Sequence, residues 1–212
     1  ISIGLMLIPS KETIYTEFLP DFAPTVDEKK LIEIIKSQLD ENIDVIDLIP
    51  ILVQEKNEYI YYKTDHHWTT LGAYYGYYAL SELLEFHPVS IQEFNKEIVS
   101  DNFLGSMYRK VNLYKGSPDK IIKYSLEDSA VSIVINEAFT KDSMFDESYL
   151  DKNDKYSYFL GGDFGLVDIN TNVKNGKSIL VIKDSFSNSM VPYLLEHYEN
   201  IYLIDTRYYG LS

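Results

Sequence analysis

Three short apolar runs, each stopped by a polar or turn-forming residue, constrain the fold of this chain more than any other feature. The first, IGLMLI, ends at Pro9; the second, SILVI, ends before Lys183; the third, IYLI, ends at Asp205. A continuous apolar run of this length is typical of a strand, and the first run favours a strand buried on both faces. We therefore expect strands in all three places.

Segments with helical periodicity alternate with these runs. Leu31, Ile34 and Ile35 lie on one face of residues 26–42, and Thr25 followed by Glu28 matches a capping box. Residues 69–87 also have a helical pattern, with Thr69 or Thr70 near the N-cap and Pro88 as the stop, and residues 186–198 resemble a further helix. This alternation predicts a three-layer α/β fold with a mainly parallel sheet.

The length of 212 residues favours one domain spanning residues 1–212. Within it, residues 91–162 are less regular, since short β-like pieces such as AVSIVI and YSYFL alternate with acidic loops. We interpret residues 91–162 as an insertion or a peripheral lobe. Because little follows the last apolar run, we also expect that the domain ends early and lacks a final strand.

Composition excludes several classes of function. There are 19 Lys and Arg residues against 33 Asp and Glu residues, a formal net charge of −14, so the surface would repel a nucleic-acid backbone. The chain has no cysteine, which rules out disulfides, zinc–thiolate sites and a cysteine nucleophile. We expect no nucleic-acid partner.

The turn after the second apolar run is the first candidate for chemistry. In α/β sheets, functional groups collect where strands end and helices begin, and Lys183-Asp184-Ser185 occupies such a place. A serine there exposes its hydroxyl close to backbone N–H groups that can stabilise an oxyanion.

The second candidate is the cluster Asp65-His66-His67-Trp68, just before the helical pattern that starts at Thr69. Serine needs a base, usually a histidine oriented by a carboxylate. Asp65 and His67 are two positions apart, so in an extended segment their side chains point the same way. His67 would accept the Ser185 proton, and Asp65 would fix the tautomer of His67.

The same residues also have interpretations that involve no catalysis. Ser185 suits a turn or an N-cap, and Asp65 suits a helix-entry cap. His66 and His67 could also ligate a metal, but no third ligand stands at convincing spacing, and His87 and His197 resemble helix-end residues. We expect no metal and no cofactor.

Five segments together resemble the bacterial DHHW proteins, relatives of the alginate O-acetyltransferase branch of SGNH hydrolase-like proteins. They are YYKTDHHWTTLGAYY, FLGSMY, YSYFLGGDFGLVDINT, ILVIKDSFSNSMVPYL and YLIDTRYY, in the order that the family has. The resemblance implies a flavodoxin-like SGNH fold in which the Asp/His element precedes the serine. It gives Ser185 the nucleophile position, His67 the base position and Asp65 the orienting acid position.

Further site residues follow from the resemblance. Gly105 in FLGSMY and Gly162 with Asp163 in GGD are candidate oxyanion or substrate-binding positions, although an ionised Asp163 would repel an oxyanion. Arg207 in DTRYY resembles an arginine near the active site of the acetyltransferase branch. We expect Trp68 to form a wall beside His67, and His66 to have a supporting role.

The resemblance implies an extracytoplasmic O-acetyltransferase that modifies a cell-surface polysaccharide through an acetyl-serine intermediate. A membrane-bound O-acyltransferase would supply the acetyl group, and any membrane anchor would lie outside this sequence. We expect a monomer. A carbohydrate acetylesterase with the same triad, or a non-catalytic glycan-binding module, remains an alternative. The distance between Ser185 and His67 bears most directly on the choice between catalysis and binding alone.

Overall fold

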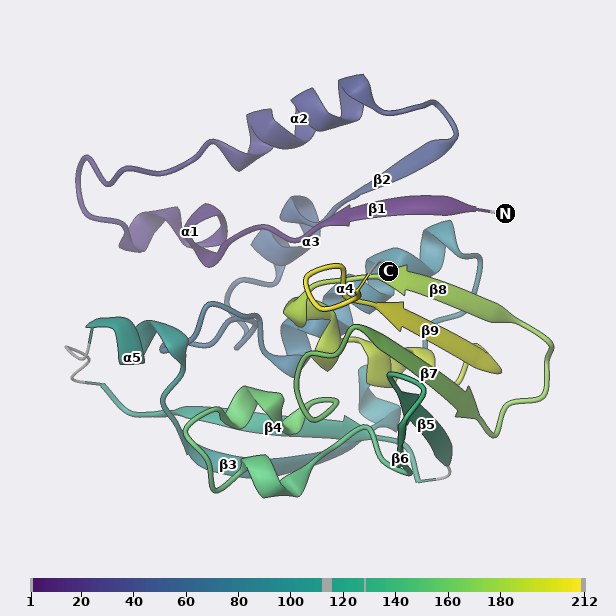
Figure 1. Ribbon diagram of the computed structural model, residues 1–212. Coiled ribbons are helices and arrows are strands. Elements are labelled where there is room, and N and C mark those ends of the chain that lie inside the picture. The colour runs from purple at the N-terminus through teal and green to yellow at the C-terminus, as the bar shows by residue number, and fades with distance from the viewer. Residues whose placement is uncertain (1, 112–115, 128, 211–212) are drawn as a thin grey trace.

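In the computed structural model, which describes residues 2–111, 116–127 and 129–210, the chain mixes helices and strands (Figure 1). The α-helices are α1 (Lys11–Ile14), α2 (Glu28–Gln38), α3 (Ile49–Gln54), α4 (Thr70–Leu83) and α5 (Ser106–Val111). The strands are β1 (Ile3–Leu7), β2 (Ile43–Asp47), β3 (Asn95–Phe103), β4 (Asp119–Ser125), β5 (Val131–Ile135), β6 (Phe139–Lys141), β7 (Leu166–Thr171), β8 (Ser178–Ile182) and β9 (Asn200–Ile204). Short 3-10 helices are η1 (Thr16–Phe18), η2 (Ile91–Glu93), η3 (Glu147–Tyr149), η4 (Lys155–Tyr158), η5 (Ser185–Ser189) and η6 (Val191–Leu194).

The described strands form three sheets. A five-stranded sheet has the order β6-β5-β7-β9-β8, and β1–β2 and β3–β4 form separate pairs. In Figure 1 the β1–β2 pair lies with α2 on one side of the molecule, and β3 and β4 lie on the opposite side. Helix α4 contacts β2, β4, η5 and η6, so it connects these parts of the fold.

The prediction of a mixed α/β protein is confirmed, but the prediction of a mainly parallel, flavodoxin-like sheet is wrong for the described strands. In the five-stranded sheet only β8 and β9 pair in parallel, whereas β6–β5, β5–β7 and β7–β9 are antiparallel. A parallel neighbour needs a long crossover, usually a helix. Helical crossovers join β1 to β2 and β8 to β9, and both of these pairs are parallel.

The less regular middle of the chain is partly integrated into the central sheet. We expected residues 91–162 to be an insertion or a peripheral lobe, yet they supply β5 and β6 of the five-stranded sheet, while β3 and β4 form their own pair. The segment YSYFL, which has a β-like pattern, contains the end of the 3-10 helix η4 instead.

Two further local expectations need correction. The first strand, β1, is not buried on both faces, because it pairs only with β2 and Ile3 is 52% exposed. The segment after Ser185 forms η5 and η6 rather than an α-helix. Pro192 cannot donate a backbone hydrogen bond, and the Ser- and Asn-rich start of the segment competes for backbone groups.

The entrance to α4 agrees with the sequence pattern. Thr69 is the N-cap, since its hydroxyl accepts a hydrogen bond from the Gly72 N–H at 3.3 Å. A side chain at Gly72 would collide with the Ile60 carbonyl, and one at Gly76 would press on the Trp68 ring. These two glycines let the segment around Trp68 lie directly against the helix.

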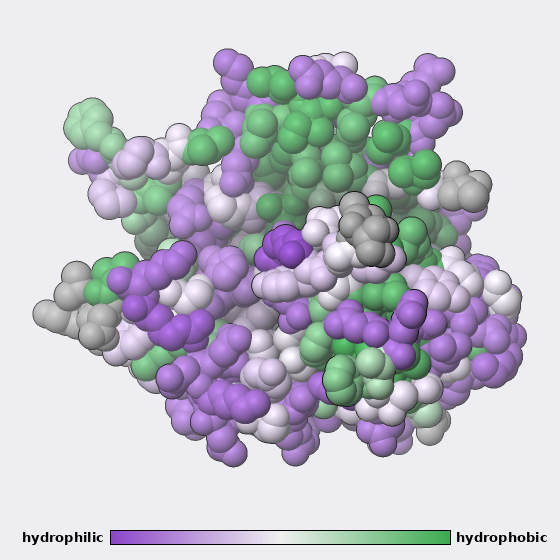
Figure 2. Space-filling view, viewed as in Figure 1, coloured by the Kyte–Doolittle hydropathy of each residue, from purple (hydrophilic) through white to green (hydrophobic). Residues whose placement is uncertain are grey.

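Two hydrophobic clusters fill the interior. The larger one includes Trp68, Tyr77, Tyr193 and Ile201, and the smaller one contains the aromatic residues Tyr62, Phe103, Tyr156, Tyr158 and Phe159. Apolar surface also remains exposed between α2 and β8, where Figure 2 shows hydrophobic residues gathered. Among the described residues, no helix has the length and apolar character to cross a membrane.

Candidate active site

Strands β8 and β9 bring two functional turns to one edge of the sheet. Their last residues, Ile182 and Ile204, are register partners, and the Lys183 N–H donates to the Ile204 carbonyl at 2.8 Å. The chain then turns into η5, which starts at Ser185, and the Asp184 carboxylate caps the turn by accepting from the Phe186 N–H at 3.0 Å. Ser185 therefore lies at the carboxyl end of a strand, as the sequence predicts.

Ser185, His67 and Asp65 form a continuous hydrogen-bonded chain. His67 Nε2 lies 2.8 Å from Ser185 Oγ, and His67 Nδ1 lies 2.6 Å from Asp65 Oδ1. Asp65 and His67 are buried, whereas Ser185 is partly exposed. The structure thus brings together the three residues that we selected from two distant segments, in the arrangement that activates a serine hydroxyl.

The Asp65 carboxylate is held by donors on both oxygens. The His67 N–H donates to Oδ1 at 3.0 Å and the Ser106 N–H donates to Oδ2 at 2.6 Å. Burial raises the pKa of Asp65, but the hydrogen bonds from the His67 ring and from these N–H groups outweigh burial and place the pKa well below its usual range. The carboxylate therefore stays ionised next to the His67 imidazole.

Gly105 lies directly behind this carboxylate. A Cβ atom at Gly105 would collide with the Asp65 side chain, and the Gly105 N–H donates to Thr64 Oγ1 at 3.0 Å. Position 105 requires a glycine because any larger residue would collide with the Asp65 carboxylate. A role of Gly105 at the oxyanion stays a prediction.

Two charged side chains from other elements hold the loop that carries Asp65. Asp119, at the start of β4, accepts from the Lys63 N–H at 2.9 Å, from the Thr64 N–H at 2.7 Å and from the Thr64 hydroxyl. Lys11 Nζ, on α1, donates to the carbonyls of Tyr62 at 3.0 Å and Asp65 at 2.9 Å. A carboxylate thus satisfies the loop's N–H groups and an ammonium satisfies its carbonyls.

Aromatic rings lie on both sides of the His67 imidazole. Tyr156 is stacked in parallel, with ring centroids 3.7 Å apart and planes 4° apart, and the His66 ring lies 3.8 Å away. His66 is half exposed and its Nδ1 lies 2.7 Å from Ser106 Oγ. Burial and the nearby His67 lower the pKa of His66, so its ring is neutral at neutral pH. This position fits the supporting role that we expect for His66.

Trp68 ties the histidine loop to the serine turn. It is completely buried, and its indole N–H donates to the Phe186 carbonyl at 3.0 Å and to Ser189 Oγ at 3.1 Å. Its ring also meets the Phe186 ring edge to face, with centroids 5.7 Å apart. Trp68 therefore contacts the protein interior, and Phe186 and His66 are the more exposed rings beside His67.

Asp163 and Arg207 belong to an ionic network beside the serine turn. Asp163 Oδ1 accepts from Asn188 Nδ2 at 2.9 Å, and Arg207 donates to Asp163 Oδ2 at 3.3 Å and to Asp205 Oδ2 at 2.6 Å. The hydrogen bonds to Asp205 raise the pKa of Arg207, so its charge is permanent. Arg207 is therefore engaged with two carboxylates rather than solvated alone.

Lys183 completes this network from inside the protein. Its side chain is fully buried, and Nζ donates to Asn188 Oδ1 at 2.7 Å and lies 3.7 Å from both Asp163 and Asp205. Burial lowers the pKa of Lys183, while the two carboxylates oppose this shift. The Gly162 carbonyl lies 3.5 Å from Asn188 Nδ2. The network thus joins the ends of β8 and β9 to η5 and to the loop containing Asp163.

Asp65, His66 and His67 place atoms that could ligate a metal within 4.8 Å of one another. However, Asp65 Oδ1 already bonds to His67 Nδ1, and His67 Nε2 bonds to Ser185. A metal ion would have to break the Asp65–His67 bond. The donor set therefore suits proton transfer better than metal binding.

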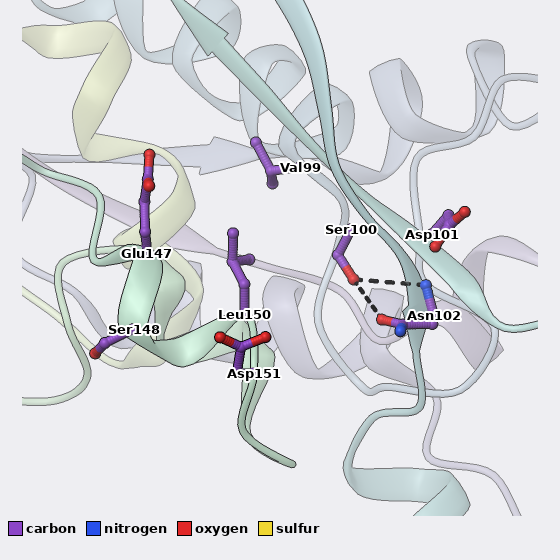
Figure 3. A pocket seen from close by; sticks show the side chains of 8 residues that line it. All are labelled: Val99, Ser100, Asp101, Asn102, Glu147, Ser148, Leu150 and Asp151. Atoms are coloured by element: carbon purple, nitrogen blue, oxygen red, sulfur yellow. Dashed lines mark hydrogen bonds between the residues drawn. The ribbon is translucent and has the colours of Figure 1, made fainter.

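An open hollow of about 610 Å³ lies elsewhere, between β3 and η3 (Figure 3). Figure 3 shows Val99 and Leu150 as its apolar residues, together with polar and acidic side chains, and the Ser100 hydroxyl bonds to the Asn102 side chain at 2.9 Å. Neither Ser185 nor His67 lines this hollow. The catalytic candidates therefore do not coincide with it.

Several residues of the site escaped the sequence analysis. Asp119 and Lys11 are single charges with no pattern around them, and Asn188 differs little from its polar neighbours. Tyr156 and Ser106 lie inside two of the segments that carry the family resemblance, so their location in those segments was the only available signal.

A comparison with known proteins identifies the family of this chain. The family model for the DHHW protein family matches residues 6–204. The chain belongs to the DHHW family. The match includes Asp65, His67 and Ser185, and so the whole hydrogen-bonded chain. No match was found among curated proteins.

Two solved structures of similar proteins, with TM-scores of 0.86 and 0.80, share the fold of this chain. A DHHW family protein from Eubacterium siraeum, solved at 1.49 Å, is 30% identical with a TM-score of 0.86, covering 100% of this chain and 71% of that chain. Bacillus cereus PatB1 with a sulfonyl adduct is 20% identical with a TM-score of 0.80, covering 99% of this chain and 74% of that chain. The O-acetyltransferase domain of Pseudomonas putida AlgJ is 23% identical with a TM-score of 0.46, covering 58% of this chain and 48% of that chain.

Proposed function

We propose that this DHHW protein is a serine-dependent O-acetyltransferase of the SGNH-like class. The observation that carries the proposal is the bond between His67 Nε2 and Ser185 Oγ at 2.8 Å, continued by the 2.6 Å bond between His67 Nδ1 and Asp65. A glycan-binding module has no need for a buried acid and base aligned on a partly exposed serine.

In the first half-reaction, Ser185 Oγ attacks the carbonyl carbon of an acetyl ester while His67 Nε2 accepts the hydroxyl proton. The tetrahedral intermediate collapses when the donor's alkoxide leaves and takes that proton from His67, which leaves an acetyl-serine ester. Asp65 stabilises the imidazolium that forms between these steps, because its own carboxylate is held ionised by the Ser106 and His67 N–H groups.

In the second half-reaction, a sugar hydroxyl attacks the carbonyl carbon of the acetyl-serine while His67 Nε2 accepts the hydroxyl proton. The tetrahedral intermediate collapses to the acetylated sugar when Ser185 Oγ leaves and takes that proton from His67. We propose a cell-surface polysaccharide as the acceptor and an extracytoplasmic site of action, with a membrane-bound O-acyltransferase supplying the acetyl group. These elements rest on the sequence resemblance to the alginate O-acetyltransferase relatives. Gly105, Gly162, Asp163 and Arg207 remain predicted contributors to binding, directly or through the ionic network.

Intact-mass measurement after incubation with p-nitrophenyl acetate tests the mechanism. The wild-type protein should gain the mass of one acetyl group on Ser185, and Ser185→Ala should gain none and lose turnover. Ser187→Ala is the matched control, because Ser187 is a buried serine of the same turn. An unmodified Ser185, with equal turnover in Ser185→Ala, would disprove the proposal.

Product analysis then separates acetyl transfer from hydrolysis. The protein is incubated with the donor ester in the presence and absence of a panel of oligosaccharides. A transferase forms acetylated sugar at the expense of free acetate, whereas an esterase releases the same amount of acetate in both cases. Release of acetate alone across the panel would contradict the transferase assignment while leaving the triad in place.

A further inference from the structure

We infer that Tyr156 is a positioning residue that holds the base and the nucleophile in register. The inference rests on the proposed function, since it assigns Tyr156 to the proton transfer between Ser185 and His67. Tyr156 belongs to η4, far in the sequence from both partners, and contacts each of them.

The ring of Tyr156 contacts the base. It lies parallel to the His67 imidazole at 3.7 Å between centroids, and the His66 ring lies at 3.8 Å. Two rings at such distances cannot share one face of the imidazole, so His67 is enclosed from both sides. Rotation of His67 about its side-chain bonds would collide with one of them. The ring plane that directs Nε2 at Ser185 is therefore fixed by packing.

The hydroxyl of Tyr156 contacts the nucleophile's backbone. It donates to the Ser185 carbonyl at 3.0 Å and lies 3.1 Å from Ser189 Oγ, which also accepts from the Trp68 indole. One rigid side chain thus spans from the imidazole to the first residue of η5. Any shift of the serine turn along the sheet edge would have to break this bond or disturb the stacked pair.

The electrostatics of the stack favour the charged form of the base. The face of an aromatic ring carries negative potential, so it attracts the imidazolium that appears when His67 takes the serine proton. Burial raises the pKa of Tyr156 far above its usual range, so the phenol stays neutral and keeps its proton for the Ser185 carbonyl. The stack therefore stabilises the charge without adding a second anion beside Asp65.

Burial excludes a direct role in substrate binding. Tyr156 is buried and packs edge to face on Tyr62 and against Phe159 in the smaller aromatic cluster. It acts on the reaction only through His67 and Ser185. Its loss should thus change the rate of the chemical step more than the affinity for the substrate.

Two variants and one control separate the ring from the hydroxyl. Tyr156→Phe keeps the stacked ring and removes the bond to Ser185, whereas Tyr156→Leu removes both. Tyr158→Phe is the matched control, because Tyr158 is a buried tyrosine of the same cluster whose hydroxyl has no partner among the described residues. The rate constant for acylation of Ser185, kcat and KM are measured for each protein, with thermal unfolding as the check on folding.

We expect Tyr156→Phe to lower the acylation rate about fivefold, the cost of one hydrogen bond. Tyr156→Leu should lower it about 100-fold, as a misplaced base does, with KM changed by less than about twofold. Tyr158→Phe should match the wild type. Equal acylation rates in Tyr156→Leu and the wild type would overturn the inference. A Tyr156→Leu protein with a higher KM and a lower stability but an unchanged kcat would also overturn it.

Proton NMR distinguishes this failure from failure of the proposed function. The Nδ1 proton shared by His67 and Asp65 should give a low-field resonance in the wild type and in Tyr156→Phe, broadened or lost in Tyr156→Leu. If Ser185 of the wild type is never acylated, the proposed function fails. The resonance still tests whether Tyr156 holds His67 in position. A resonance unchanged in Tyr156→Leu, or a Tyr156→Phe variant that already loses it, overturns the inference independently of activity.

Discussion

The indole N–H of Trp68 donates a hydrogen bond of 3.0 Å to the backbone carbonyl of Phe186, so the residue after His67 is bonded to the residue after Ser185. The same N–H reaches Ser189 Oγ at 3.1 Å. Trp68 thus connects the segment that carries His67 to the segment that carries Ser185.

Replacing Trp68 by phenylalanine should weaken this connection. Trp68→Phe keeps an aromatic ring in the core but removes the shortest hydrogen bond to the Phe186 carbonyl, at a cost of about 1–2 kcal/mol in the free energy of unfolding. We expect kcat to fall about tenfold, since the serine turn gains freedom. Chemical denaturation and steady-state kinetics on the same preparation measure both effects. An unchanged kcat in a destabilised Trp68→Phe protein would show that the bond is only structural.

Asp65→Asn should leave the fold largely intact and disable the base. The amide cannot accept the His67 Nδ1 proton and the backbone N–H groups as the carboxylate does, so His67 is no longer held in the tautomer that presents a free Nε2 to Ser185. A comparable change in a serine triad lowers kcat by about 10⁴-fold. Kinetics with an activated ester measure the loss, and a loss smaller than about tenfold would argue against Asp65 as the orienting acid.

The lowered pKa of Asp65 predicts an acid-dependent stability. A carboxyl group whose pKa is lower in the folded state contributes stability above its ordinary pKa of about 4, and this contribution is lost as the pH falls toward the folded value. The free energy of unfolding should therefore decrease on acidification below about pH 4. Asp205, whose pKa is lowered by its hydrogen bonds from Arg207, contributes in the same direction. Denaturation at several pH values should give a smaller decrease for Asp65→Asn; an equal slope would refute the assignment.

Asp119→Asn should destabilise the loop that carries Asp65. The amide presents N–H groups where the Lys63 N–H, the Thr64 N–H and the Thr64 hydroxyl already donate, so at least one buried donor loses its acceptor. We expect a loss of about 3 kcal/mol in the free energy of unfolding, with reduced activity at temperatures where the protein is still folded. Asp101→Asn, at an exposed position on β3, is a suitable control. Equal melting temperatures for both variants would contradict this role of Asp119.

Gly105→Ala tests the contact behind the acid. The added methyl group would collide with the Asp65 side chain, so either the carboxylate moves away from His67 or the FLGSMY segment shifts. We expect a fall in kcat of about 100-fold. Gly210→Ala, where nothing lies within 4 Å of the added atom, is the matched control and should behave like the wild type. Full activity in Gly105→Ala would show that Asp65 is held less tightly than its contacts indicate.

The sequence predicts those parts of the site that depend on local patterns. Ser185 follows an apolar run and Asp65 with His67 precedes a capped helix, so each half of the site could be located from its own neighbours. The direction of strand pairing could not be predicted in this way, because it depends on which segments cross over the sheet. The alternation of apolar runs and helical patterns suggested parallel neighbours throughout, but β7 pairs antiparallel with both β5 and β9.

The residues that support the site could not be predicted, for a different reason. Tyr156 is one of 19 tyrosines and has no distinctive spacing, so only the fold reveals that it is stacked on His67. Lys183 and Asp205 each end an apolar run, which predicts a turn but not that both are buried facing each other. Such contacts depend on the packing of distant segments, which no local pattern encodes.

The separation of 118 residues between His67 and Ser185 makes the proposed reactivity a property of the native state alone. During synthesis the acid and base leave the ribosome long before the serine does, and an unfolded chain carries only an ordinary, unreactive hydroxyl. When a sulfonyl fluoride reacts with a serine, the serine oxygen bonds to sulfur and fluoride leaves. Such a reagent should therefore label folded molecules and spare nascent or misfolded ones. Counting labelled molecules during refolding would turn Ser185 into a direct gauge of the native fraction.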